Sequence, residues 1–157
     1  MFKILNSLEH NSQIYTFRIK ILTNNLPTMQ NLSIRYPHLY TTSNCTQCLT
    51  TEDTAHILLC TKNTPNIQQS LIDIINNTLT SLKISTITAQ TLLNILLHFT
   101  LNTSNPQYHY ILLSITGTFP LTIYTNIKNI VQKQTDSLLI NLSNNLLKWL
   151  YIDIWSQ

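Results

Sequence analysis

The sequence is poor in charged residues, which make up 10% of its 157 residues, and only six of these residues are acidic. The six are scattered along the chain. Because a two-metal nuclease or polymerase site needs several converging carboxylates, this scatter argues against a self-contained enzyme of either kind. The formal net charge is only +3, so the chain as a whole also lacks the large excess of basic residues that is typical of nucleic-acid-binding proteins. We therefore expect no independent catalytic activity.

Glycine occurs once in the chain, and alanine and valine are almost as rare. Asparagine, isoleucine and threonine are abundant instead, together with 26 leucines. The hydrophobic fraction of 43% supplies enough apolar surface for folding and argues against disorder. Asparagine and threonine are poor helix formers, so packing must hold any helices that form. A chain of this length is expected to fold as one domain, or as a small module with a helical extension.

A long uncharged stretch lies between Lys83 and Lys128, where forty-four residues contain no Asp, Glu, Lys or Arg. Its apolar core over residues 92–101 is about half of the roughly 20 residues that a membrane-spanning helix needs. We therefore expect buried helices and no membrane span. The first ten residues also do not resemble a secretory signal, so we expect an intracellular protein, in either the nucleus or the cytoplasm.

Apolar residues recur at steps of three and four along most of the chain, which is typical of helices. No internal repeat and no strict alternation is present, so the fold class is expected to be mostly α. The expected helices cover residues 14–22, 29–35, 67–82 after a Thr64-Pro65 start, 92–99, 108–115, 119–131 and 138–155 after a Thr135-Asp136 cap.

All three cysteines lie within sixteen residues, and a histidine lies among them. Cys45, Cys48, His56 and Cys60 form the pattern C-x2-C-x7-H-x3-C. Zinc prefers four thiolate or imidazole ligands at tetrahedral angles, and a Cys-x2-Cys turn aims two sulfurs at one point. We therefore predict one structural Zn²⁺ ion, because four protein ligands leave no position open for a catalytic water.

The second half of this pattern also suits a metal site. His56 and Cys60 are four residues apart and would share one face of a short helix. Thr50 or Thr51 would cap that helix, with Glu52 and Asp53 in its first turn. The other interpretations are three buried free thiols, or one disulfide with a spare thiol. Free cysteines do not usually collect at ligand spacing beside a histidine, and disulfides are disfavoured inside cells.

The four predicted ligands belong to a longer series of motifs in the sequence. This series includes a helix with an aromatic residue next to an arginine, a Leu-Pro-Thr turn and a pair of acidic residues. The motifs are Phe17-Arg18, Leu26-Pro27-Thr28, Leu32, Tyr36-Pro37, Cys45-x2-Cys48, Glu52-Asp53 and His56-x3-Cys60. Over residues 12–62 this order resembles the zinc-binding domain that follows the reverse transcriptase or ribonuclease H region in non-LTR retrotransposons. That family often has Pro after the first cysteine and Gly after the second, where this chain has Thr46 and Leu49. We expect a reshaped turn that keeps the ligands.

The resemblance implies a zinc-binding module over residues 1–62, which a helical extension forming an irregular bundle follows over residues 63–157. Whether the two pack as one domain is open. It further implies a structural-zinc accessory module of a retrotransposon-derived reverse transcriptase/ribonuclease H protein, which assists nucleic-acid binding and is not catalytic by itself. Such a polypeptide is then an expected partner. Binding to RNA or DNA is expected to be weak and non-specific. The candidate contacts are Arg18, Lys20, Arg35, His38 and Lys62.

A second function is equally compatible with a structural zinc site. The module could be a zinc-stapled helical surface for protein–protein interaction, without nucleic-acid binding. Trp149, Tyr151 and Trp155 motivate this alternative, because aromatic residues are enriched at interfaces. The sequence leaves the oligomeric state open.

Overall fold

The computed structural model describes residues 12–54, 56, 60, 67–98 and 114–155. Its elements are the helices α1 (Ser12–Leu22), α2 (Met29–Arg35), α4 (Ile67–Ser81), α5 (Ala89–His98), α7 (Leu121–Val131) and α8 (Thr135–Trp149), a 3-10 turn (Gln132–Gln134) and a terminal π-helical turn (Leu150–Trp155). The described part is mostly helical and contains no strand. The prediction of a mostly α fold is confirmed.

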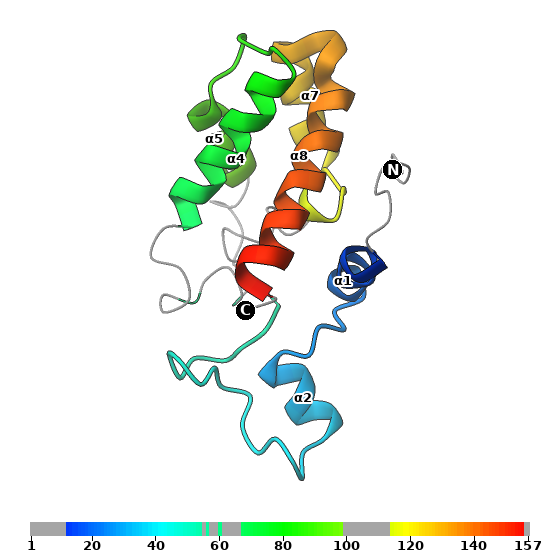
Figure 1. Cartoon of the computed structure of the whole chain (residues 1–157), viewed down its shortest axis with the longest axis vertical. Coiled ribbons are helices and arrows are strands. Elements are labelled where there is room, and N and C mark those ends of the chain that lie inside the picture. The colour runs from blue at the N-terminus through cyan, green and yellow to red at the C-terminus, as the bar shows by residue number, and fades with distance from the viewer. Residues whose placement is uncertain (1–11, 55, 57–59, 61–66, 99–113, 156–157) are drawn as a thin grey trace.

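Helices α4, α5, α7 and α8 form a bundle around the long axis of the molecule (Figure 1). α4 packs against both α5 and α8, and α7 packs against α5 and α8. The apolar stripe of α8 explains this arrangement, because Leu138, Leu142 and Leu146 recur every four residues and are almost completely buried. Burial of this stripe offsets the poor helix propensity of the polar faces.

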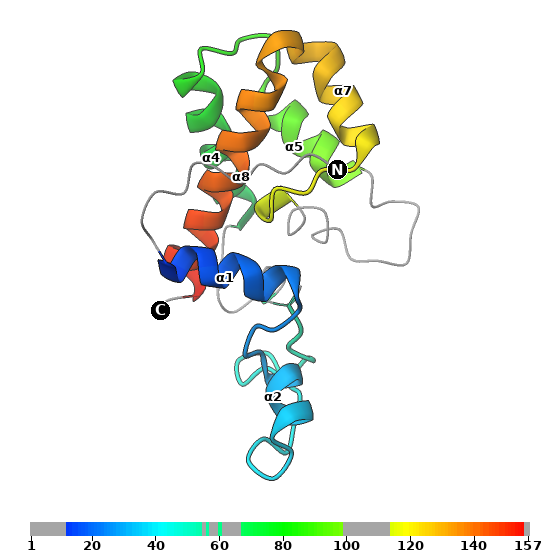
Figure 2. The same cartoon turned by 90° about the vertical axis from the view of Figure 1, so that its right-hand side faces the viewer.

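α1 lies across the C-terminal end of α8 and shares its core (Figure 2). Ile14, Phe17 and Ile21 recur at helical steps and belong to the same buried cluster as the leucines of α8. The Phe17 ring also packs against the rings of Tyr151 and Trp155, at centroid distances of 5.3 and 5.6 Å. α1 therefore has a common core with the C-terminal part of the chain.

α2 and the loop that follows it project away from this core (Figures 1 and 2). α2 has the predicted bounds, and its N-cap is Thr28, whose hydroxyl accepts a hydrogen bond from the Asn31 N–H. None of its residues is buried. Leu26 and Thr28 just before it are fully buried. Leu26 therefore anchors the chain just before α2 in the core, whereas α2 itself has little apolar packing.

The start of α8 differs from the predicted Thr135-Asp136 cap. Thr135 is the first residue inside the helix, where its hydroxyl donates to the Gln132 carbonyl. The chain passes directly from the 3-10 turn into α8, so the preceding backbone takes the place of a side-chain cap. α7 begins at Leu121, close to the predicted position after Gly117, which has a φ of +78°.

Some predicted features lie outside the described residues. These are the Thr64-Pro65 start, Phe99, residues 108–113, residues 57–59 of the predicted short helix and Lys62. The uncharged stretch is only partly covered by the described residues, which include α5 and most of α7. Within the described chain, no helix is both long enough and apolar enough to cross a membrane.

Candidate metal centre

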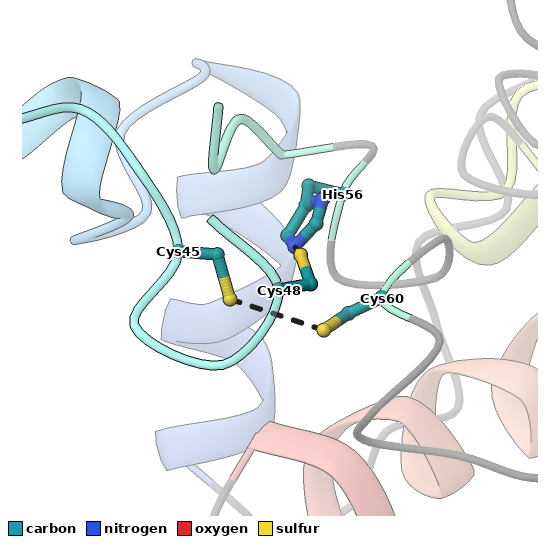
Figure 3. A group of neighbouring side chains, drawn as sticks. All are labelled: Cys45, Cys48, His56 and Cys60. Atoms are coloured by element: carbon teal, nitrogen blue, oxygen red, sulfur yellow. Dashed lines mark hydrogen bonds between the residues drawn. The ribbon is translucent and has the colours of Figure 1, made fainter. Parts of the chain in front are cut away.

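The side chains of Cys45, Cys48, His56 and Cys60 converge on one point (Figure 3). Their ligand atoms all lie within 4.8 Å of one another. The Cys45 and Cys60 sulfurs are 3.8 Å apart, and the Cys48 sulfur is 3.3 Å from His56 Nε2. In a tetrahedron with zinc bond lengths, two sulfurs would be about 3.8 Å apart and sulfur and nitrogen about 3.5 Å apart. The four side chains therefore could hold a tetrahedral metal ion.

A tight hairpin places the first two ligands. The Cys45 N–H donates to the Thr50 carbonyl at 2.7 Å, and the Leu49 N–H donates back to the Cys45 carbonyl at 3.0 Å. Leu49 has a φ of +64°, in the left-handed region that favours glycine. The turn thus keeps the conformation that glycine would supply at this position, and both sulfurs stay on the inside.

The other two ligands come from a single turn of chain. The Cys60 N–H donates to the His56 carbonyl at 2.8 Å, which is the hydrogen bond expected for residues four apart in a helix. Asp53 Oδ1 accepts the His56 N–H at 2.7 Å and caps this turn. The predicted cap at Thr50 or Thr51 is therefore wrong. Asp53 is nearer in sequence to the unpaired N–H groups, and Thr50 contacts the ligands instead.

Thr50 contacts two of the four ligands, and sequence reasoning missed this role. Its hydroxyl oxygen lies 3.0 Å from the Cys48 sulfur and 3.3 Å from His56 Nδ1. Since Nε2 faces the sulfurs, a proton on Nδ1 can be donated to Thr50, whose own hydroxyl then donates to Cys48. In the sequence, this role is indicated only by a hydroxyl-bearing residue two positions after the second cysteine.

The two halves of the hairpin give the thiols different environments. Burial raises the pKa of the Cys45 thiol. The hydrogen bond from the Thr50 hydroxyl lowers the pKa of the Cys48 thiol, which is partly exposed. A metal ion would stabilise the thiolate form of both, because a coordinated thiol is deprotonated.

Glu52 connects the hairpin to α2. Its carboxylate accepts the Met29 N–H at 3.2 Å, and its carbonyl accepts the Gln30 N–H at 3.1 Å. Both donors belong to the first turn of α2, where N–H groups lack partners within the helix. Glu52 was predicted in the first turn of the His56 helix, and it instead completes the N-terminus of a different helix. The ligand hairpin and α2 are thereby one hydrogen-bonded unit.

Arg18 is not a surface contact for nucleic acid, contrary to the prediction. Its side chain is only 5% exposed. Its guanidinium donates to the Ser143 hydroxyl at 3.0 Å, to Asn144 Oδ1 at 3.3 Å and to the Ile115 carbonyl at 3.4 Å. No carboxylate contacts it among the described residues, and burial lowers the pKa of the guanidinium. Arg18 therefore joins α1 to the bundle.

The remaining described candidate contacts belong to two different parts of the chain: Lys20 to α1, and Arg35 and His38 to the C-terminal end of α2 and the turn after it. Lys20 is exposed in the last turn of α1, and Arg35 is exposed in the last turn of α2, where it donates to Asn25 Oδ1. His38 is exposed in the turn after α2. Lys62 lies outside the described residues. No two of the three described residues come from the same helix.

Comparison with known proteins found no family model, no curated protein and no solved structure that matches the chain. The resemblance to the retrotransposon zinc-binding domain therefore depends on the order of motifs. Function must be argued from the chemistry of the site.

Proposed function

We propose that this chain is a zinc-stabilised accessory module of a retrotransposon-derived reverse transcriptase/ribonuclease H protein, and that it is not catalytic by itself. The observation that carries the proposal is the convergence of three sulfurs and one imidazole within 4.8 Å, with two of the pairs close to the spacing of a tetrahedral zinc site. Soft thiolates with one imidazole in a tetrahedron favour zinc among the common metals. Four protein ligands would leave no open coordination position, which supports a structural role.

The position of the site explains what a structural ion would contribute. α2 has no buried residues, and the N–H of its first residue donates to Glu52, which lies in the loop between Cys48 and His56. This loop is called the ligand loop below. A bound Zn²⁺ ion would crosslink the Cys45 hairpin to the turn that contains His56. The crosslink would hold α2 at a fixed place relative to α1, where apolar packing is scarce.

In this proposal the module assists nucleic-acid binding within the larger protein. Lys20, Arg35 and His38 are exposed and supply positive or titratable groups for phosphate contacts. They are few and dispersed, so we expect weak, non-specific and salt-sensitive binding of RNA or DNA.

The alternative is a protein–protein interaction module, and one observation favours it. Ile34, Leu39 and Leu49 are 72%, 68% and 75% exposed on the projecting part of the chain. Large apolar side chains that are this exposed are common at interfaces. A reverse transcriptase/ribonuclease H polypeptide is the partner that we propose for them.

Three measurements test these proposals. Elemental analysis of freshly purified protein should find one zinc per chain, and its absence would remove the zinc proposal. Filter binding to single-stranded RNA and to duplex DNA at low salt should detect weak binding; no binding of either would remove the nucleic-acid role. Light scattering after size-exclusion chromatography, with and without a candidate polypeptide, tests the alternative, which a strict monomer in both cases would contradict.

A further inference from the structure

A groove lies between α1 and the terminal π-helical turn. Its volume is about 400 Å³, and its residues come from the two ends of the described chain. α1 contributes Gln13, Thr16, Phe17 and Lys20 to its lining, and the terminal turn contributes Tyr151 and Trp155. Among the described residues that line the groove, none is acidic. The groove therefore combines planar aromatic side chains with one positive charge.

The aromatic side of the groove is held in place by its neighbours. The ring of Phe17 is buried and inclined by 57° to that of Tyr151 and by 40° to that of Trp155. The Tyr151 hydroxyl donates to Gln13 Oε1 at 3.1 Å, which ties the terminal turn to α1. Tyr151 and Trp155 remain partly exposed. Their free ring surface is thus available to a ligand without rearrangement of the core.

We propose that this groove binds an unpaired base of single-stranded nucleic acid, with Lys20 in contact with an adjacent phosphate. Aromatic side chains stack on any base, and nearby positive groups follow the backbone, which gives binding with little sequence preference. The Gln13 amide keeps its N–H groups as donors, and the Thr16 hydroxyl, which donates to the Ser12 carbonyl, can still accept a hydrogen bond. A duplex would hide the faces of its bases, so single strands should be preferred.

This inference rests on the nucleic-acid-binding part of the proposed function, and it names where that binding occurs. It is independent of the metal site, because none of the four candidate ligands lines the groove. It also gives Lys20 a role that differs from that of Arg35 and His38. Lys20 lies beside aromatic rings, whereas the other two lie on the projecting part of the chain.

Tryptophan fluorescence tests the groove directly, since the chain has two tryptophans and only Trp155 lines it. In the Trp149→Phe variant, Trp155 is the only reporter. Titration of this full-length variant with an eight-nucleotide oligouridylate at low salt should quench its emission. The same oligonucleotide in duplex form should quench it much less. Unchanged emission while filter binding detects the oligonucleotide would overturn the groove and leave the proposed function standing.

Substitutions provide the second arm of the experiment. Trp155→Ala should weaken oligonucleotide binding by about 5-fold or more, and Trp155→Phe should retain most of it. Lys20→Gln should weaken binding and reduce the salt slope by about one. The matched control is Lys128→Gln, because Lys128 lies 5.6 Å from the ring of Tyr124 on α7, away from the groove.

The possible outcomes distinguish failure of the groove from failure of the proposed nucleic-acid function. Equal affinity of Lys20→Gln, Trp155→Ala and the unaltered protein, together with unchanged Trp155 emission, would overturn the groove. Equal losses for Lys20→Gln and Lys128→Gln would show a general charge effect and overturn the role of Lys20. No binding of any oligonucleotide by the unaltered protein would overturn the nucleic-acid function as well, while the zinc content would still test the metal site.

Discussion

The guanidinium of Arg18 donates a hydrogen bond to the hydroxyl of Ser143 across 3.0 Å, although the two residues are 125 positions apart in the chain. Ser143 in turn donates to the carbonyl of Ile115 at 3.2 Å. The pair therefore connects three segments: α1, α8 and the turn before α7. A polar contact of this kind inside an apolar core fixes the position of α1 on the bundle.

Substitution of Arg18 should lower stability rather than nucleic-acid affinity. Arg18→Ala removes the buried side chain and its three hydrogen bonds, and we expect a loss of about 2 to 4 kcal/mol in the free energy of unfolding. Urea denaturation measures this loss. Lys20→Ala, an exposed position two residues away, should change stability by no more than about 0.5 kcal/mol. Unaltered stability together with weaker RNA binding would restore Arg18 as a surface contact.

Removal of the metal should unfold one part of the chain selectively. Chelation should increase hydrogen exchange over residues 26–60, because α2 lacks buried residues and depends on the ligand loop. α1 should remain protected, since its apolar face belongs to the bundle core. His56→Ala should reproduce the effect of chelation, and His38→Ala is the control. Uniform loss of protection throughout the chain would contradict this division.

The helices and the ligand set were predictable because both depend on local spacing. Apolar steps of three and four placed α1 and α2, and the four ligands lie within sixteen residues. The burial of Arg18 was predictable from the helix period, because positions 14, 17, 18 and 21 share one face of the helix. The charge of Arg18 favoured the surface interpretation instead. Its partners Ser143 and Ile115 could not be predicted, because their contact depends on how distant segments pack.

The contacts around the ligands were less predictable. Glu52 and Asp53 are adjacent, yet one completes the N-terminus of α2 and the other caps the turn at His56. Nothing in an acidic pair specifies which N–H groups each carboxylate will reach. Nor does the sequence mark the residues with positive φ, because Asn24, Leu49, Lys83 and Gln132 adopt it although none of them is glycine.

Loss of the Thr50 hydroxyl should weaken metal binding without abolishing it. Thr50→Val keeps the shape of the side chain but removes the hydrogen bonds to Cys48 and His56. We expect an affinity loss of about 10- to 100-fold in competition with a zinc chelator, as for other residues that orient metal ligands. Thr50→Ser should retain most of the affinity, and the exposed neighbour Thr51→Val is the control. Equal affinity of Thr50→Val and the unaltered protein would contradict this role.

Replacement of Leu49 by glycine should stabilise the metal-bound module. A left-handed conformation is unfavourable by roughly 1 to 2 kcal/mol for a residue with a side chain, and this penalty disappears in glycine. The greater freedom of glycine in the unfolded chain offsets part of the gain, so we expect a net increase of up to about 1 kcal/mol. Because the Leu49 side chain is 75% exposed, little apolar packing is lost. Thermal unfolding of the zinc-loaded protein measures the change, and Leu49→Ala, which keeps the penalty, is the control. A lower unfolding temperature for Leu49→Gly than for Leu49→Ala would contradict this prediction, because it would show that relief of the left-handed penalty does not exceed the entropic cost of glycine.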